Sequence, residues 1–247
     1  MEPINIAIIV AVYFIAAFYS SLAGGASLLT IPTLIFAGLS PHTALGTNKI
    51  GTFGLSAGAS LGYGMEDKID YKFSTIFMIF LVIGSAVGSY TVLSLPEQAI
   101  KKAIGVVMIV IASFLFFNKD FGTKTMKRTK RNILIFVLFS IASGFYSGFY
   151  GAGAGTINRF MLSAFFAYTM INSAAISTFA NMASNIFALA VFTYYGAVQY
   201  SLFVPIILAS FTGAFFGSKY AIRIGNVNIK RLLLIVSVIM AVKLLFF

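Results

Sequence analysis

Residues 5–22 read NIAIIVAVYFIAAFYSSL and contain no charged side chain. A helix rises about 1.5 Å per residue and the hydrocarbon core of a bilayer is about 30 Å thick, so one crossing needs about 20 largely uncharged residues. No lysine or arginine precedes Lys49, so the run lacks the positive flank of a cleaved signal peptide. The stretch predicts a retained first membrane span, and several later runs are of the same kind.

The whole chain has the composition of an all-α polytopic membrane protein. Its 247 residues are 60% hydrophobic and 9% charged, with a mean hydropathy of +0.97, whereas soluble domains are about 45–50% apolar and about 25% charged. The net charge of +11 does not indicate a nucleic-acid partner, because the basic residues cluster between apolar runs. With no cysteine and one histidine, the sequence offers no disulfide, thiol chemistry or Cys/His metal site.

Ten apolar runs predict a fold with about 8–10 membrane elements. Two of them, 26–38 and 156–170, are too short to cross the hydrocarbon core untilted, and they follow the glycine clusters Gly24-Gly25 and Gly151–Gly155. We interpret both as broken or re-entrant helices that pair with the preceding element. The other runs are 5–22, 43–63, 72–94, 98–117, 132–150, 172–195, 200–221 and 232–247.

The two halves of the chain resemble each other. Four landmarks recur at offsets of 127–132 residues, among them Phe18-Tyr-Ser at Phe145 and Gly84-xxx-Gly88-Ser at Gly213. The near-constant offset predicts a duplication, and chance matching of abundant glycine and phenylalanine is the alternative. The predicted units are a first repeat at 1–117, a linker at 118–131 and a second repeat at 132–247.

Loop charges predict the orientation of the chain. Cytoplasmic loops carry an excess of lysine and arginine, and the linker 118–131 contains six basic residues, so it is predicted to be cytoplasmic. Because each span carries the chain to the other side of the membrane, the loops 64–72 and 219–231 are also predicted to be cytoplasmic. The basic residues of the outer loops are then only Lys101 and Lys102. Equivalent loops of the two halves then face opposite sides. This arrangement predicts inverted-topology repeats, a plan common among transporters.

The segment Ser40-Pro-His-Thr-Ala-Leu-Gly-Thr-Asn-Lys49 places a lysine inside an otherwise uncharged run. A lysine deep in a bilayer costs about 2.5–3.5 kcal/mol, so it needs a partner, a wet cavity or a path to the headgroups. All six carboxylates fall in predicted loops or termini, so an anionic substrate is the natural partner. The alternative is that Lys49 lies near a helix start and extends to the headgroups.

Arg159 is the second cation inside a predicted span, and it follows the second glycine cluster. It either serves an anion or extends outward to the headgroups. Asn181 and Asn185 are four residues apart and therefore share a helix face, and at an offset of 132 residues Asn181 aligns with Lys49. These polar patches are predicted to line one cavity, with hydrogen bonding between packed helices as the alternative.

The glycines that precede the two short elements are Gly24, Gly25, Gly151 and Gly153. Such breaks leave backbone N–H groups free at the next helix start, where the helix dipole stabilises an anion by about 0.3–2 kcal/mol. The alternative is close helix packing, which we expect for the repeated Gly-xxx-Gly pattern.

Motifs in both halves of the sequence resemble those of one known family. The pair Gly24-Gly25 before a short apolar run, the segment Pro41–Lys49 and Tyr63 resemble the first repeat of the sulfite exporter TauE/SafE family, also called the toluene sulfonate uptake permease family. The second half agrees through Ser143–Gly155, Asn181-xxx-Asn185 and Gly213–Arg223. The resemblance covers essentially the whole chain.

The resemblance implies a transporter in the cytoplasmic membrane of a bacterium or archaeon for small sulfur-containing anions such as sulfite, sulfonates or sulfoacetate. Residue by residue, it assigns Thr47, Asn48, Lys49 and the two glycine clusters to the substrate region. Arg159 departs from the apolar or aromatic residue expected there, so it either tunes substrate choice or has no part in it.

The sequence therefore predicts a secondary carrier, most simply an exporter, that moves a small anion across the lipid bilayer by alternating access. An anion channel, or a carrier of another small organic or inorganic anion, is the alternative. An enzyme is not expected, because one histidine, no cysteine and no acid within a predicted span leave almost no acid–base or metal chemistry. No cofactor, no nucleic-acid partner and no particular oligomeric state is implied.

Overall fold

The computed structural model describes residues 3–99, 130–166 and 168–246, with side chains except at 3–5, 130–132, 164 and 226–246. Within these residues the regular structure is helical throughout, without a β-strand, which confirms the all-α class. Residues 118–129 of the expected linker 118–131 and most of the expected run 98–117 lie outside the described residues, while Lys130 and Arg131 of that linker already belong to a helix.

The first half folds into four helices, and local side chains cap the starts of the last two. Ser40 precedes Pro41, and its hydroxyl accepts a hydrogen bond from the Thr43 amide at 3.4 Å. Asp70 accepts one from the Phe73 amide at 3.0 Å. Both are the capping residues that helix N-termini prefer. The helices are α1 (Pro3–Ala23), α2 (Ser27–Phe36), α3 (Pro41–Gly64) and α4 (Tyr71–Leu93).

The second half repeats this order of long and short helices. Its elements are α6 (Lys130–Phe149), α7 (Ala154–Phe166), α8 (Met170–Tyr194), the short 3₁₀ turn η1 (Tyr200–Leu202) and α9 (Phe203–Phe246). The expected loop between the last two runs, 222–231, is instead helical, and only Gly225 interrupts α9, with a φ of 77° and a ψ of 167°. A glycine adopts this backbone at little cost, so one residue is enough to redirect the helix.

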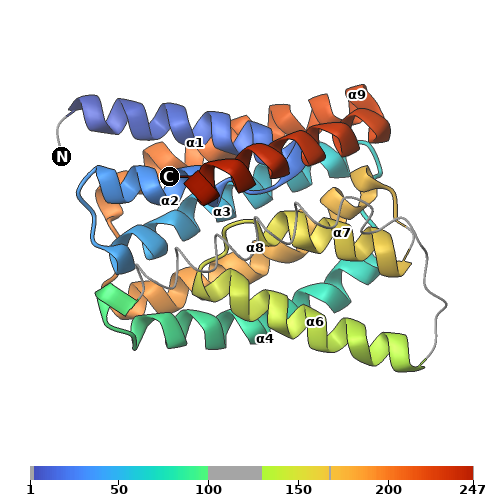
Figure 1. Ribbon diagram of the computed structural model, residues 1–247, viewed down its shortest axis with the longest axis horizontal. Coiled ribbons are helices and arrows are strands. Elements are labelled where there is room, and N and C mark those ends of the chain that lie inside the picture. Colours follow the sequence, from blue (N-terminus) through green and yellow to red (C-terminus); the bar gives the residue numbers. More distant parts are fainter. Residues whose placement is uncertain (1–2, 100–129, 167, 247) are drawn as a thin grey trace.

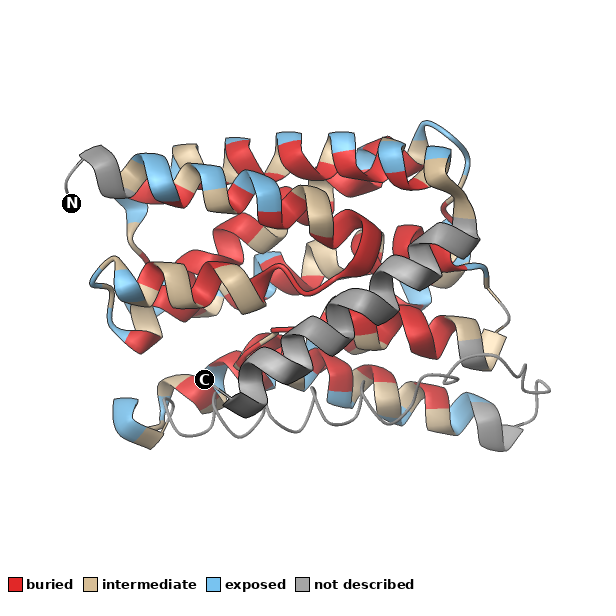
Figure 2. Cartoon of the chain, turned by 45° about the horizontal axis from the view of Figure 1, so that its top comes forward, coloured by how far each residue is buried: buried red, intermediate tan, exposed pale blue. Residues whose placement is uncertain are grey.

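Among the described residues, four helical stretches are long and apolar enough to cross a bilayer: Ile6–Ala23, Tyr71–Leu93, Met170–Tyr194 and Tyr200–Gly225. Their outward faces carry apolar side chains, such as those of Ile83, Val87 and Leu208, each at least 50% exposed. Figure 2 shows buried positions on the helix faces that point into the molecule and exposed positions on the outer faces. The chain is therefore a multi-pass membrane protein.

The short helices α2 and α7 lie in opposite parts of the molecule. In Figure 1, α2 occupies the end at which the N-terminus lies, and α7 occupies the other end. Each begins in the interior, after the helix before it has been broken at a glycine cluster. The expectation of short, broken helices at these two places is confirmed by α2 and α7.

Glycines bring long helices from opposite halves into backbone contact. A Cβ on Gly84 or Gly88 of α4 would lie 2.0 Å from a carbonyl oxygen of α6. A Cβ on Gly213 or Gly217 of α9 would lie 2.3 Å from a carbonyl oxygen of α1. The packing role expected for both Gly-xxx-Gly patterns is thereby confirmed.

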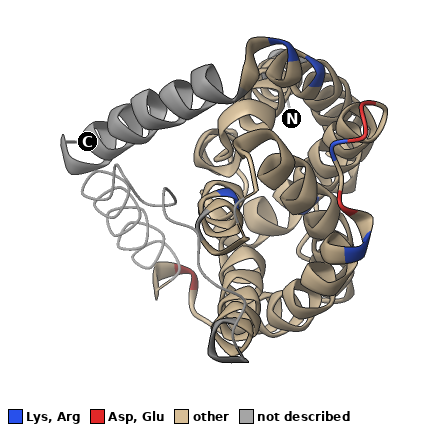
Figure 3. Cartoon of the chain, turned by 90° about the vertical axis from the view of Figure 1, so that its right-hand side faces the viewer, with Lys and Arg blue, Asp and Glu red and all other residues tan. Residues whose placement is uncertain are grey.

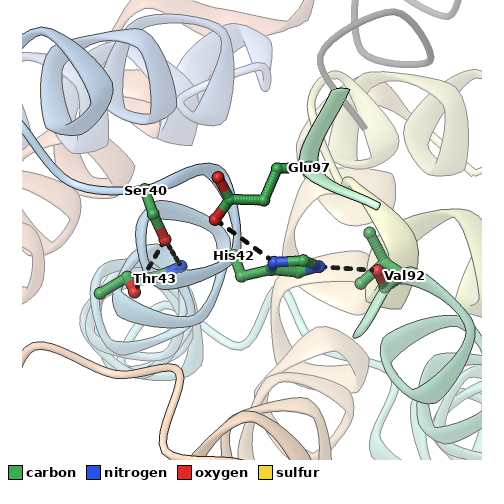
Figure 4. Close-up of polar contacts among 5 residues, drawn as sticks. All are labelled: Ser40, His42, Thr43, Val92 and Glu97. Carbon is green, nitrogen blue, oxygen red and sulfur yellow. Dashed lines mark hydrogen bonds and ion pairs between the residues drawn. The ribbon is translucent and has the colours of Figure 1, made fainter. Parts of the chain in front are cut away.

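Charged side chains of the described residues lie mainly at the ends of the bundle. The end-on view in Figure 3 shows most of the coloured positions in loops and at helix ends around the rim. At one end, an ion pair joins His42 Nδ1 to Glu97 Oε1 at 3.7 Å. Figure 4 shows the imidazole between Glu97 and the Val92 carbonyl, so the ring connects the start of α3 to the end of α4.

Candidate functional site

The two glycine clusters, far apart in sequence, lie against each other inside the bundle. Gly24 has a φ of +77°, and a Cβ there would lie 2.4 Å from Thr156 Oγ1. The Thr156 hydroxyl donates to the Ala23 carbonyl at 2.8 Å. The break between α1 and α2 therefore packs directly on the first turn of α7.

A small cavity of about 60 Å³ opens beside this contact. A water molecule needs about 10–15 Å³ of such space, so there is room for about four waters or for one ion of similar size. Both short helices begin at the cavity, and α3 and α8 line its sides. Six of the predicted site residues are among its walls: Gly25, Lys49, Gly151, Arg159, Asn181 and Asn185.

Lys49 projects from the middle of α3 and is 2% exposed. Its ammonium group donates a hydrogen bond to the Ser147 carbonyl, in the last turn of α6. A side chain this deeply buried does not reach the headgroups, so the interpretation in which Lys49 extends outward is excluded. A buried ammonium with one carbonyl partner still lacks a counter-charge.

Arg159 enters the same cavity from α7 and is also 2% exposed. Its Nη2 donates to the Ser20 carbonyl at 2.7 Å, whereas its Nε and Nη1 are buried without a hydrogen-bond partner. Burial again excludes an outward-pointing side chain. Buried hydrogen-bond donors are rarely left without an acceptor in folded proteins.

The two cations reach across the molecule in a reciprocal way. Lys49 belongs to the first half and contacts Ser147 of the second, while Arg159 belongs to the second half and contacts Ser20 of the first. Ser20 and Ser147 close the two copies of the Phe-Tyr-Ser triplet. Each cation is therefore held by the equivalent carbonyl of the opposite half.

No acidic residue lines the cavity. Within the part of the chain that has described side chains, the carboxylates are those of Glu66, Asp67, Asp70 and Glu97, and all four are exposed. The same residues contain no group of three or more side chains able to hold a metal ion. The cavity wall therefore carries the positive charge of Lys49 and Arg159, and no carboxylate in the wall neutralises it.

The two asparagines of α8 face the polar side of α3, as their spacing predicted. Asn185 Nδ2 donates to Ser56 Oγ at 3.3 Å, so it bridges α8 to α3. Asn181 lines the cavity, and its Oδ1 is buried without a partner. Asn185 therefore combines packing with a place in the cavity wall, and Asn181 has unused hydrogen-bonding capacity there.

Thr47 and Asn48 lie outside the wall of this cavity. The Thr47 hydroxyl accepts from the Gln199 amide at 2.9 Å. The Asn48 carbonyl oxygen accepts from Tyr13 at 3.1 Å and from Thr30 at 2.6 Å, and its amide donates to Ser27 at 3.0 Å. Asn48 thus fixes the start of α2, where Ser27 lines the cavity.

Gly24 and Gly153 lie outside the cavity wall and shape the backbone that leads into α2 and α7. Gly153 has a φ of +79° and accepts, through its carbonyl, from the Ile157 amide at 3.1 Å, in the first turn of α7. The first amides of a helix have no partner within it, and the cavity wall includes the starts of both α2 and α7. Two helix N-termini therefore point their positive ends toward one cationic cavity.

Sequence reasoning missed several hydroxyl groups in the cavity wall. Thr52 and Ser56 follow Lys49 by three and seven residues on α3, so helical spacing would have placed them on its face. Ser20 and Ser147 were visible only as repeat landmarks. Their closeness to the cations depends on long-range packing that the local sequence does not reveal.

Comparison with known proteins agrees with this architecture. A family model described as sulfite exporter TauE/SafE matches residues 9–244. A probable membrane transporter protein of Haemophilus influenzae is 29% identical over 241 residues, which cover 98% of this chain and 94% of the relative. The probable membrane transporter protein ORF9 of Sinorhizobium sp is 32% identical over 234 residues, covering 94% and 89%. The probable membrane transporter protein YfcA of Escherichia coli K12 is 26% identical over 246 residues, covering 100% and 91%.

No solved structure matches the chain at a significant level. The family match nevertheless runs through nearly all of the chain and includes both short helices and both buried cations. Together with the multi-pass helical fold, it identifies a membrane transporter: the chain belongs to the sulfite exporter TauE/SafE family.

Proposed function

We propose that the protein is a secondary transporter that exports small sulfur-containing anions, such as sulfite, sulfonates or sulfoacetate. The observation that carries this proposal is a cavity with two buried cations and no carboxylate in its wall. A sulfur oxyanion offers several acceptor oxygens to the unpaired Arg159 donors, to Lys49 and to the helix starts. The family description supports the sulfur chemistry.

The transport cycle we propose is alternating access between two inverted repeats, 1–117 and 132–247. Packing supports this plan, because α4 of the first half lies on α6 of the second and α9 of the second lies on α1 of the first. Transporters of this kind hold substrate between the repeats, at the ends of broken helices. Here each half supplies one broken helix and one cation to the cavity.

The proposed location is the cytoplasmic membrane, with the basic linker 118–131 on the cytoplasmic side. Lysine and arginine are concentrated in loops predicted to lie on that side. Export of one negative charge from a negative cell gains about 2.3 kcal/mol per 100 mV. The membrane potential therefore favours the outward direction without a coupling ion.

The direct test is flux into and out of liposomes that contain the purified protein. We expect saturable transport of sulfite or sulfoacetate that empty liposomes lack. Absence of saturable flux with every sulfur anion tested would contradict the proposal. Single-channel currents would instead favour an anion channel with Lys49 at its constriction.

A binding test separates ligand recognition from transport. A ligand that binds the folded state raises its apparent stability by mass action. The detergent-purified protein should be stabilised against heat by sulfite, thiosulfate or sulfoacetate, and not by chloride. Stabilisation by chloride alone would redirect the proposal to a different anion.

A further inference from the structure

We infer that the cavity selects anions that carry two negative charges, and that Arg159 supplies the second positive charge this selection requires. The inference rests on the proposed function and deepens it, because sulfite, thiosulfate and sulfoacetate can be dianions whereas simple sulfonates are monoanions.

Charge balance is the first step. Lys49 and Arg159 line the same cavity, both are 2% exposed, and the cavity wall contains no acidic side chain. A buried charge without a counter-charge is strongly unfavourable. A monoanion leaves one of the two cations uncompensated, whereas a dianion neutralises both.

Donor geometry is the second step. Arg159 uses Nη2 on the Ser20 carbonyl and keeps Nε and Nη1 buried without a partner. Nε shares an edge of the guanidinium with Nη2 and not with Nη1, so the free Nε and Nη1 donors lie on different sides of the group and each can bind an oxygen of an anion. Lys49 approaches from α3, where its ammonium donates to the Ser147 carbonyl, and an ammonium has three donors. An anion between the two side chains therefore has donors for two separate charged oxygens.

The third step distinguishes the two cations. Lys49 places its ammonium on the Ser147 carbonyl, whereas Arg159 keeps two buried nitrogens without a partner beside its bond to Ser20. Arg159 is therefore the cation with unused donors for a second charged oxygen. Replacing Arg159 by an apolar residue should convert a dianion site into a monoanion site without abolishing it.

The experiment measures competing anion fluxes in proteoliposomes with pairs matched in size and different in charge. Sulfate is compared with perchlorate, and sulfoacetate with 2-hydroxyethanesulfonate. The wild-type protein should prefer the dianion of each transported pair by at least about tenfold in flux at limiting concentration, which corresponds to about 1.4 kcal/mol. Arg159→Met should lower the dianion flux by at least about tenfold and keep or raise the monoanion flux. Arg159→Lys should retain the dianion preference.

Lys219→Met is the matched control, because Lys219 lies over the Phe215 ring on α9, away from the cavity wall. It should leave the preference unchanged. Size-exclusion profiles and heat stability check that each variant is folded. Equal flux of both charge classes in the wild type, or an intact dianion preference in folded Arg159→Met, would overturn the inference while leaving the carrier in place. A lack of saturable flux with any anion would contradict the proposed function itself.

Discussion

At the scale of single residues, we expect Lys49 to decide whether the cavity binds an anion. Lys49→Ala should abolish stabilisation by sulfite in thermal unfolding, because the ammonium that faces the cavity is lost. The protein should still insert and fold, since a buried cation with one carbonyl partner contributes little net stability. Lys49→Arg should bind more weakly than the wild type, because the planar guanidinium does not fit the space of an ammonium.

Lys219→Ala serves as the control for a lost positive charge outside the cavity. It should keep the full stabilisation by sulfite. If Lys49→Ala binds sulfite as tightly as the wild type, the anion site lies elsewhere.

Asn48 is adjacent to Lys49 but has a structural role, because its side chain bonds to neighbouring helices outside the cavity wall. Asn48→Ala leaves the buried Tyr13 hydroxyl without its acceptor, whereas the Thr30 hydroxyl keeps a bond to the Ala26 carbonyl at 3.3 Å. An unsatisfied buried group costs about 1–3 kcal/mol, so the apparent Tm should fall by about 2–12 °C. Thr33→Val is the matched control, because the Thr33 hydroxyl bonds only within its own helix, to the Leu29 carbonyl at 2.8 Å. Equal Tm values for the two variants would refute a structural role for Asn48.

At the scale of helices, close backbone contact is what joins the two halves. A Cβ on Gly88 would lie 2.0 Å from the Phe145 carbonyl oxygen, so Gly88→Ala must push α4 away from α6. Overpacking of this kind costs about 1–3 kcal/mol. Gly155→Ala is the control for stability, because its Cβ would have no neighbour closer than 4.0 Å. Heat stability should fall for Gly88→Ala and stay near the wild type for Gly155→Ala.

The break between α1 and α2 allows the cost of a strained backbone to be separated from the cost of a steric clash. Gly24 and Gly38 both have positive φ values, of +77° and +94°, so alanine is strained at either position. Only at Gly24 would the Cβ meet another helix, 2.7 Å from the Thr156 amide nitrogen. Gly24→Ala should therefore lose both heat stability and anion flux, while Gly38→Ala loses about 1 kcal/mol of stability and keeps its flux. Similar flux in both variants would show that contact between the breaks is dispensable.

Much at the helix scale could be predicted from the sequence, because glycine clusters and charge placement are local signals. The short helices after Gly24-Gly25 and Gly151–Gly155 were predicted, and so was the backbone contact at Gly84 and Gly213. The expected division between 200–221 and 232–247 is present, because two helices meet at a kink at Gly225. A loop over 222–231 was wrong, since this single glycine turns the chain. Polarity alone does not end a helix when one residue can supply the turn.

The site was only partly predictable for a physical reason. Helical spacing and charge identified Lys49, Arg159, Asn181 and Asn185, because a polar group in a membrane span must have a partner. The partners themselves, the Ser20 and Ser147 carbonyls, belong to helices about a hundred residues away or more in sequence. Backbone acceptors carry no sequence signature, so only the fold reveals them.

At the scale of the whole molecule, the decisive question is whether the two repeats have opposite orientations. The loops after α3 and after α8 are equivalent in the proposed duplication, since Tyr63-Gly and Tyr195-Gly end the two helices. In Figure 1 these helices end at opposite ends of the molecule. The chain has no cysteine, so single cysteines at Glu66 and Ser201, both exposed, report the side of each loop against a clean background.

A membrane-impermeant maleimide should label Ser201→Cys in intact cells and Glu66→Cys only after the membrane is opened, because the basic loop that follows α3 is predicted to be cytoplasmic. The reverse pattern would keep the inverted repeats but turn the protein over in the membrane, and the export direction would then lose its support from loop charge. Labelling of both cysteines from the same side would mean that the repeats are parallel. In that case the two cations could not approach one cavity from oppositely oriented halves, and alternating access by exchange of the two halves would have to be abandoned.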